Sequence, residues 1–81
     1  MSMAQAGRQA EKITDAVSFG AALRRRRKAL HYTQADLAEY TGFSESFLSD
    51  LERGKPTAEL GKALLLANLL GLDVTLEARE E

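Results

Sequence analysis

The sequence from Thr33 to Gly54 carries two closely spaced helix-start signals, and these restrict the folds open to the chain. Thr33 and Asp36 have the spacing of a capping box, in which each side chain bonds a backbone amide of the other residue. A helix that starts there ends at Gly42, because glycine readily adopts the left-handed conformation that closes a helix. Ser44 then caps a second helix, which stops at Gly54. The spacing predicts two short helices joined by a tight turn.

One further helix is predicted on each side of this pair. Asp15 is positioned to cap a helix that reaches about Ala29, and Thr57 to cap a helix of about thirteen residues that ends at Gly71. Apolar and polar residues then alternate over Leu72–Ala78, which is the period of a β-strand. We therefore expect an all-α domain of four to five helices, followed by one short C-terminal strand.

The chain of 81 residues has room for one small domain. Residues 1–14 are small, polar and aperiodic and predict a flexible leader, residues 15–71 hold the helices, and residues 72–81 form the strand and tail. No apolar run approaches the ~20 residues of a membrane span. The N-terminus also lacks the apolar core of a signal peptide, so we expect a cytoplasmic protein without membrane contact.

The composition leaves little material for catalysis. The absence of cysteine excludes disulfides, thiolate metal sites and thiol catalysis. His31 is the single histidine and does not supply a metal site by itself. No acid, base and nucleophile are grouped in the sequence, so we expect no enzymatic activity, no metal and no cofactor.

Basic residues are concentrated in one part of a slightly acidic chain. The formal net charge is −1, from 11 basic and 12 acidic residues. Residues 16–35 nevertheless contain the basic run Arg24–Lys28 and no acid. A basic patch on an acidic background favours attraction of one face to a polyanion. The alternative is that these arginines are good helix formers on a solvated surface.

Arg27 falls on the apolar side of the first predicted helix. At about 100° per residue it shares a face with Leu23 and Leu30, whereas Arg24, Arg25 and Lys28 point outward and Arg26 lies at the margin. A guanidinium on the core face needs a partner, because an unpaired buried charge is strongly unfavourable. Glu52, at the edge of the inward face of the helix capped by Ser44, is the predicted partner.

The segment YTQADLAEYTGFSESFLSDLERGK resembles the helix-turn-helix of the lambda-repressor-like, xenobiotic-response-element (Xre) family. The matching parts are the TQ entry, LA on the following helix, the turn glycine, the serine cap and LERGK. The resemblance extends over residues 15–71. The longer C-terminal part, LERGKPTAELGKALLLANLLGLDVTLEA, is similar to the HipB-like antitoxin branch, in which a short strand follows the last helix.

The resemblance implies a DNA-reading helix and a set of phosphate contacts. The N-terminal residues of this helix meet base edges in the major groove, and the matching positions are Ser44, Glu45, Ser46 and Ser49, with Asp50 beside them. The positions that match phosphate contacts are Thr33 and Gln34, at the entry to the preceding helix, and Lys55, with Arg26 and Arg53 as further candidates. In the family, the residues that match Arg27 and Glu52 commonly form an ion pair, which agrees with the pairing inferred from the helical wheel.

The sequence departs from the family pattern in two ways. His31 stands where the family often has glycine, which predicts a somewhat strained left-handed residue. Glu45 and Asp50 place negative charge where DNA would lie. Glutamate accepts a hydrogen bond from cytosine N4, so these acids indicate either selection of particular bases or weak DNA binding. An interaction module that holds a protein with the same fold, and no DNA, stays an alternative.

A second copy of the chain is the expected partner of the C-terminal strand. No other strand is predicted, and an unpaired strand leaves its amides and carbonyls without partners. The last helix buries one face (Leu60, Ala63, Leu64, Leu66, Ala67 and Leu70) and exposes leucines on the other side. The predicted dimer interface comprises Leu65, Leu69, Leu72, Val74 and Leu76.

The sequence thus predicts a homodimeric, Xre-type transcriptional repressor of a palindromic operator in double-stranded DNA. By analogy with the HipB-like branch, it is expected to be the autoregulating antitoxin partner of a HipA-like kinase toxin. A stand-alone or phage-type repressor is the alternative, and the neighbouring gene distinguishes the two.

Overall fold

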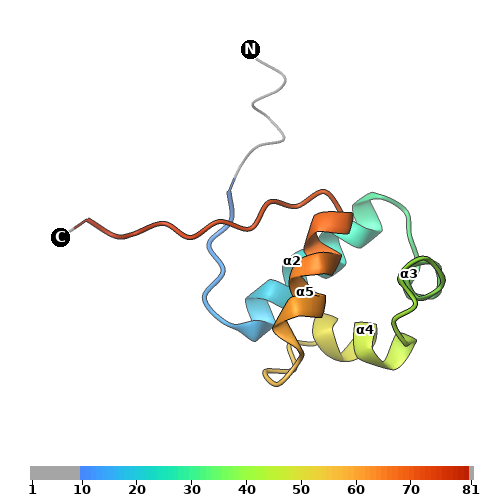
Figure 1. Ribbon diagram of the computed structural model, residues 1–81. Coiled ribbons are helices and arrows are strands. Elements are labelled where there is room, and N and C mark those ends of the chain that lie inside the picture. Colours follow the sequence, from blue (N-terminus) through green and yellow to red (C-terminus); the bar gives the residue numbers. More distant parts are fainter. Residues whose placement is uncertain (1–9, 81) are drawn as a thin grey trace, which may run out of the picture.

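The computed structural model describes residues 10–80, and these form four helices joined by short turns. In chain order they are α2 (Ala16–Ala29), α3 (Gln34–Thr41), α4 (Glu45–Glu52) and α5 (Leu60–Leu69) (Figure 1). The prediction of an all-α domain is confirmed. None of the helices in the described range has the length and apolar character needed to cross a bilayer.

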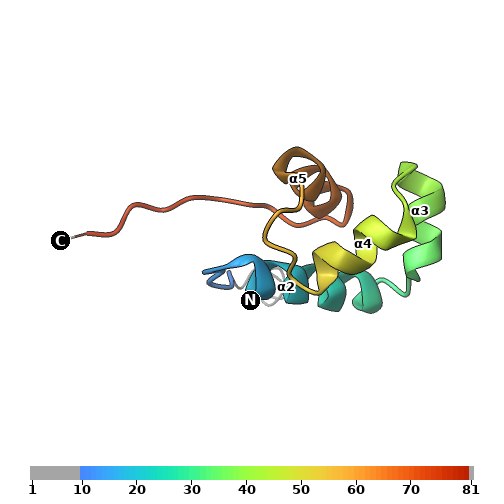
Figure 2. The same cartoon turned by 90° about the horizontal axis from the view of Figure 1, so that it is seen from below.

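Leucine and alanine side chains from all four helices form one core. α4 packs against both α2 and α3, while α5 lies over the layer of α2 and α4 and α3 stands at one end (Figure 2). Each fully buried leucine stabilises the fold by ~1.5–3 kcal/mol relative to exposure in water. The buried members of the core are Leu23, Leu37, Leu48, Leu51, Ala63, Leu66, Ala67 and Leu70.

The first three helices begin where the sequence predicts, because each has a side chain that satisfies a free amide. Asp15 accepts from the Ser18 amide at 2.8 Å, and Ser44 accepts from the Phe47 amide at 3.0 Å. Thr33 and Asp36 form the predicted reciprocal box, with distances of 3.0 and 2.8 Å. The α3–α4 turn is therefore closed at its second helix by a cap and at its first by Gly42, whose φ is 82°.

His31 ends α2 in the left-handed conformation that the sequence predicts, with φ 65°. The His31 amide donates to the Lys28 carbonyl at 2.9 Å, and the Tyr32 amide donates to the Arg27 carbonyl at 3.1 Å. This pair of bonds is a Schellman closure, which satisfies carbonyls that the helix itself leaves free. The strain of a non-glycine residue at this φ is thus offset by two backbone hydrogen bonds.

The predicted start of the last helix is wrong. α5 begins at Leu60, with Glu59 at the N-cap position and no side-chain cap bond, so Thr57 is not a cap. The Ala58 amide instead donates to the Lys55 carbonyl at 3.3 Å and closes a turn that contains Thr57. The helical wheel assumed a longer helix, and it therefore wrongly placed Leu60 on the buried face and Ala58 on the exposed face. Leu60 is 67% exposed, whereas Ala58 packs against the core.

Residues 72–80 leave α5 as an extended segment that runs away from the helices (Figures 1 and 2). Leu72 still packs against the core, and its amide donates to the Ala67 carbonyl at 2.9 Å. Val74 and Leu76 are 48% and 99% exposed. The segment has no ladder of backbone hydrogen bonds within residues 10–80. Pairing with the same segment of a second copy stays a prediction.

A buried ion pair fastens α2 to α4, as the wheel predicts. Arg27 donates through Nε to Glu52 Oε2 at 2.6 Å and through Nη2 to Glu52 Oε1 at 3.0 Å. Both residues are 7% exposed. The remaining Nη1 of Arg27 donates to the Tyr32 carbonyl at 2.8 Å, just before α3. The pair is bidentate and has further hydrogen bonds, which is the arrangement that compensates the desolvation of two charges.

Gly20 allows α2 and α4 to approach this closely. A Cβ at this position would overlap the Leu51 carbonyl oxygen and lie 2.7 Å from the Glu52 carbonyl oxygen. Both obstacles are backbone atoms, so no side-chain rotation would relieve the overlap. The glycine thus sets the distance at which Arg27 reaches Glu52.

We expect Arg27→Ala to lower the free energy of unfolding by ~3–5 kcal/mol, because it leaves the Glu52 carboxylate buried and unpaired. Arg25→Ala is the matched control. Arg25 pairs with Glu11 on the surface, with 60% of its side chain exposed, and its loss should lower the free energy of unfolding by less than ~0.5 kcal/mol. Urea unfolding of both variants measures the difference, and equal values would contradict the structural role of the buried pair.

Candidate nucleic-acid interface

The outer face of α4 presents the residues predicted to read bases. Glu45 and Ser46 are exposed, whereas Ser49 and Asp50 are partly buried. Ser44 is exposed but its hydroxyl caps the helix. Leu48 and Leu51 face the core, so the side of α4 that carries Glu45 and Ser46 is directed outward, as the wheel predicts.

The negative charge of Asp50 is largely neutralised within the same helix end. Arg53 Nη2 lies 2.8 Å from Asp50 Oδ1, and Lys55 Nζ lies 3.6 Å from Asp50 Oδ2. Arg53 also bonds the hydroxyl of Ser49. These contacts occupy the side chains of Ser49 and Asp50, so Glu45 and Ser46 are the predicted base-reading residues that have no such intramolecular partner in the described residues. The sequence alone showed two acids at this face; the structure pairs one of them.

The entry to α3 is tied to the buried ion pair through Gln34. Its Nε2 donates to Glu52 Oε1 at 3.1 Å, and the side chain is partly buried. Thr33 caps the helix beside it. The N-terminus of a helix offers free amides and the positive end of its dipole, which together favour an anion. A continuous chain of contacts thus runs from Arg27 through Glu52 to the residue predicted to contact a phosphate.

Arg26, predicted as a phosphate contact, has a role in the fold. Its Nε donates to the Leu70 carbonyl at 2.7 Å, so it satisfies a free carbonyl at the C-terminal end of α5. Its guanidinium also lies against Gly71, where an added Cβ would come within 2.9 Å of Nη2. The position of Arg26 at the margin of the wheel is the signal that it differs from Arg24 and Arg25, but the partner on α5 is not visible in the sequence.

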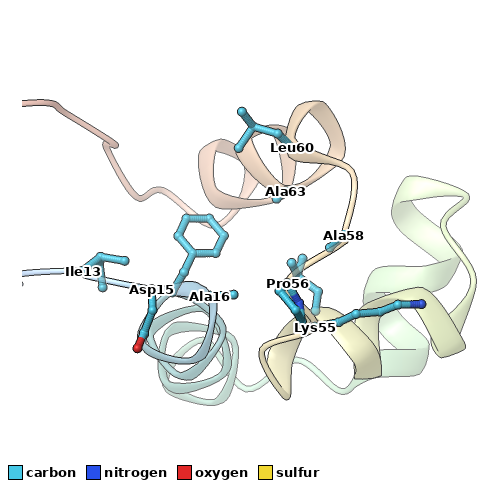
Figure 3. A pocket seen from close by; sticks show the side chains of 10 residues that line it. Ile13, Asp15, Ala16, Lys55, Pro56, Ala58, Leu60 and Ala63 are labelled. Carbon is cyan, nitrogen blue, oxygen red and sulfur yellow. The ribbon is translucent and has the colours of Figure 1, made fainter.

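An apolar groove of about 320 Å³ lies between the start of α2, the turn after α4 and the start of α5 (Figure 3). Ile13, Phe19 and Leu60 are among its lining residues. Its charged lining residues already have partners, since Asp15 caps α2 and Lys55 pairs with Asp50. We therefore place the candidate site on α3 and α4 rather than in this groove.

The charge state of Glu52 is fixed by its neighbours. Burial alone raises the pKa of a carboxyl group, but hydrogen bonds from Arg27 and Gln34 and the positive charges of Arg27 and Arg24 outweigh it. The net result is a pKa of Glu52 below its ordinary value of 4.5. The hydrogen bond with Glu52 in turn raises the pKa of Arg27. Both groups stay ionised near neutral pH.

Comparison with known proteins assigns the chain to a family. Residues 23–76 match the family model described as helix-turn-helix (HTH_3). The chain belongs to this Xre-like helix-turn-helix family of DNA-binding transcriptional regulators.

The chain is similar to named proteins of a bacterium and of a phage, and to solved structures. An uncharacterized HTH-type transcriptional regulator, y4mF of Sinorhizobium fredii (strain NBRC 101917 / NGR234), is 38% identical over 72 residues, which cover 89% of this chain and 95% of that protein. The ImmF control region 10 kDa protein of Bacillus phage phi105 is 34% identical over 60 residues, 70% of this chain and 67% of that protein.

The solved structures show the same fold. The HipB–O4 20mer complex superimposes with a TM-score of 0.78 at 22% identity, over 88% of this chain and 100% of that chain. The HipB(S29A)–O2 20mer complex gives a TM-score of 0.79 at 24% identity, over 89% and 100%. The resemblance to the HipB-like branch is thus confirmed at the level of the fold.

The depressed pKa of Glu52 predicts an acid-sensitive contribution to stability. The folded state holds the ionised carboxylate more strongly than the unfolded state, so the contribution is complete above the unfolded pKa and is lost as pH falls through the folded pKa. The free energy of unfolding of the unmodified protein should exceed that of Glu52→Gln at neutral pH. This difference should shrink as pH falls below 4.5. Urea unfolding across this range measures it, and a difference that stays constant down to acid pH would contradict the assignment.

Proposed function

We propose that the protein is a sequence-specific transcriptional repressor that inserts α4 into the major groove of DNA. The observation that carries the proposal is the outward placement of Glu45 and Ser46 on a helix whose inner face is fixed in the core. An α-helix fits the major groove, where base edges present distinct patterns of donors and acceptors. Glu45 accepts from cytosine N4, and the Ser46 hydroxyl bonds either donors or acceptors.

The entry to α3 positions the protein on the DNA backbone. Thr33 and Gln34 lie at the helix N-terminus, where amides and dipole attract a phosphate. Gln34 is held toward Glu52, so its position is coupled to that of α4. Contacts of this kind fix the register of a protein on the duplex, and base contacts then give specificity. Lys55 and Arg53 supply positive charge at the other end of α4.

The repressor acts as a homodimer in this proposal. Leu65 and Leu69 are 48% and 43% exposed on α5, and Val74 and Leu76 are exposed on the extended segment that follows. A second copy related by a two-fold axis would cover both sets with the same residues. Two copies of α4, one DNA turn apart, would read a palindromic operator.

The proposal also includes a toxin as the protein partner of this chain. We infer from the likeness to the HipB fold that the chain is the antitoxin of a HipA-like kinase toxin and represses its own operon. The similar structures are described as complexes of HipB with O4 and O2 20mers, which supports operator binding. A phage-type repressor is the second candidate, supported by the similarity to the ImmF control region protein of Bacillus phage phi105. A kinase gene beside this one favours the first, and its absence favours the second.

DNA binding should depend steeply on salt and divide the site residues into two groups. With ~6 phosphate contacts, affinity should fall ~10³-fold or more between ~50 and ~200 mM salt. Gln34→Ala should weaken binding to all sequences alike, whereas Glu45→Ala and Ser46→Ala should change the preferred bases. Selection from a randomised duplex pool, followed by gel shift on DNA upstream of the gene, measures both effects. Unchanged preference in both α4 variants would refute the assignment of α4.

The dimer depends on the C-terminal segment and should be lost when that segment is altered. Val74→Lys places a charge among the apolar residues of the predicted joint, and truncation after Gly71 removes the segment. Each should be monomeric at micromolar concentration. Burying the unpaired ammonium of Val74→Lys is strongly unfavourable, and the truncated chain lacks the segment that would pair. Thr75→Lys, on the opposite side of an extended chain, is the matched control and should stay dimeric. Light scattering gives the masses. If both Val74→Lys and the truncated chain remained dimeric, the dimer interface would lie outside the C-terminal segment.

A further inference from the structure

Lys62 of α5 is held over two aromatic rings beside the N-terminal half of α4. Its Nζ lies 5.6 Å from the ring centroid of Phe43, in the turn, and 5.5 Å from that of Phe47, in α4. The two rings pack edge to face, with centroids 5.4 Å apart. Both distances for the lysine are within the range of a cation–π interaction. The Lys62 side chain is 49% exposed, so its ammonium is fixed but reachable from solvent.

This lysine lies on the flank of α4 that is opposite to Gln34. Successive residues of a helix are about 100° apart, so Phe47 and Asp50 lie on one side of the outer face of α4 and Glu52 lies on the other. The Glu52 side contacts Gln34 at the entry to α3. The Phe47 and Asp50 side contacts Lys62 and Lys55. Each flank of the outer face of α4 therefore has a polar group that suits a phosphate.

The dimensions of DNA make a cation on this second flank useful. The major groove is ~12 Å wide and is bounded by the phosphates of both strands. A helix with its side chains is ~10–12 Å across, so it fills the groove and brings both of its flanks near phosphates. In the proposed function, Gln34 and the N-terminus of α3 contact the phosphates of one strand. The other strand would lie along the flank of Phe47.

We propose that Lys62 contacts a DNA phosphate on the strand opposite to the one that Gln34 contacts, and that Phe43 and Phe47 hold it in position. This proposal rests on the proposed function. The carboxylate of Glu59 is 3.6 Å from Lys62 Nζ, which is beyond hydrogen-bond distance. The N–H donors of the ammonium therefore have no hydrogen bond within residues 10–80 and are available to phosphate oxygens.

The aromatic rings reduce the side-chain entropy that Lys62 would otherwise lose on binding DNA. A lysine that becomes immobilised at an interface loses rotamer freedom, and this loss opposes binding. Lys62 has already lost part of that freedom in the free protein, because its position over Phe43 and Phe47 restricts the side chain. Lys55, by comparison, lies as far from the Asp50 carboxylate as Lys62 lies from that of Glu59, 3.6 Å in each case, but no cation–π contact within residues 10–80 restricts it.

The test compares Lys62→Met, Lys62→Arg and Lys12→Met on a fluorescein-labelled duplex recovered by selection from a random pool. Methionine keeps a flexible apolar stem over the rings and removes the charge, whereas arginine keeps the charge and stacks on aromatic rings. Lys12 is an exposed lysine that precedes α2 and serves as the control. Fluorescence anisotropy over a series of salt concentrations gives the slope of log affinity against log salt.

We expect Lys62→Met to make this slope shallower by ~0.9 for each chain bound, with ~8-fold weaker binding per chain at ~0.1 M salt. The preferred base sequence should not change, because a phosphate contact carries no base information. Lys62→Arg should restore the slope, and Lys12→Met should match the unmodified protein. Glu59→Gln, which removes the neighbouring carboxylate and keeps the rings and the lysine, should tighten binding.

Three results would overturn the proposal. A Lys62→Met slope equal to that of the unmodified protein, while Gln34→Ala still weakens binding, would remove Lys62 from the interface and leave the proposed function intact. A Lys62→Arg variant as weak as Lys62→Met would show that the lysine acts through local packing. An unmodified protein that binds no duplex at ~50 mM salt would refute the proposed function itself, and the role of Lys62 with it.

Discussion

The bidentate ion pair between Arg27 and Glu52 fixes the relative positions of three helices. It joins α2 to the end of α4, and the same guanidinium bonds the Tyr32 carbonyl just before α3. The same carboxylate accepts from Gln34 at the start of α3. Two short helices of eight residues each have little stability of their own, so their mutual angle must come from tertiary contacts. A shift of this pair would move α4, the proposed reading helix, and the start of α3, the proposed phosphate contact, together.

Local spacing explains why much of this fold is predictable from the sequence. The caps at Asp15, Thr33 and Ser44 depend on residues three positions away, and a single sequence contains that information. Arg27 was identified for a related reason, since a charge on an apolar face requires a partner wherever the helix packs. The outward direction of Glu45 follows from the same helical period.

The features that the sequence did not predict depend on a competing local turn and on contacts between distant segments. Thr57 has the chemistry of a cap, but the turn closed between Lys55 and Ala58 delays α5 until Leu60. The bond from Arg26 to the Leu70 carbonyl spans 44 positions, and no local pattern indicates it. Lys62 was likewise not among the candidate residues, because its two aromatic partners lie in the turn and in α4. Helical periodicity gives the direction of a side chain but not what the neighbouring element places there.

Charge pairing explains how, in the proposed function, a chain of net charge −1 presents one face to a polyanion. Asp50 is held by Arg53 and Lys55, and Glu59 lies beside Lys62. Each of these two carboxylates therefore also limits the movement of a basic side chain. An arriving phosphate would then compete with a carboxylate for an ordered cation and would not have to order a free one. Glu45 has no basic side chain paired with it in the described residues. Its carboxylate therefore needs a hydrogen-bond donor on a base edge, and the donor that carboxylates typically accept from in the major groove is the N4 amine of cytosine. In the proposed function the acid that weakens non-specific attraction is therefore also the one that selects a base.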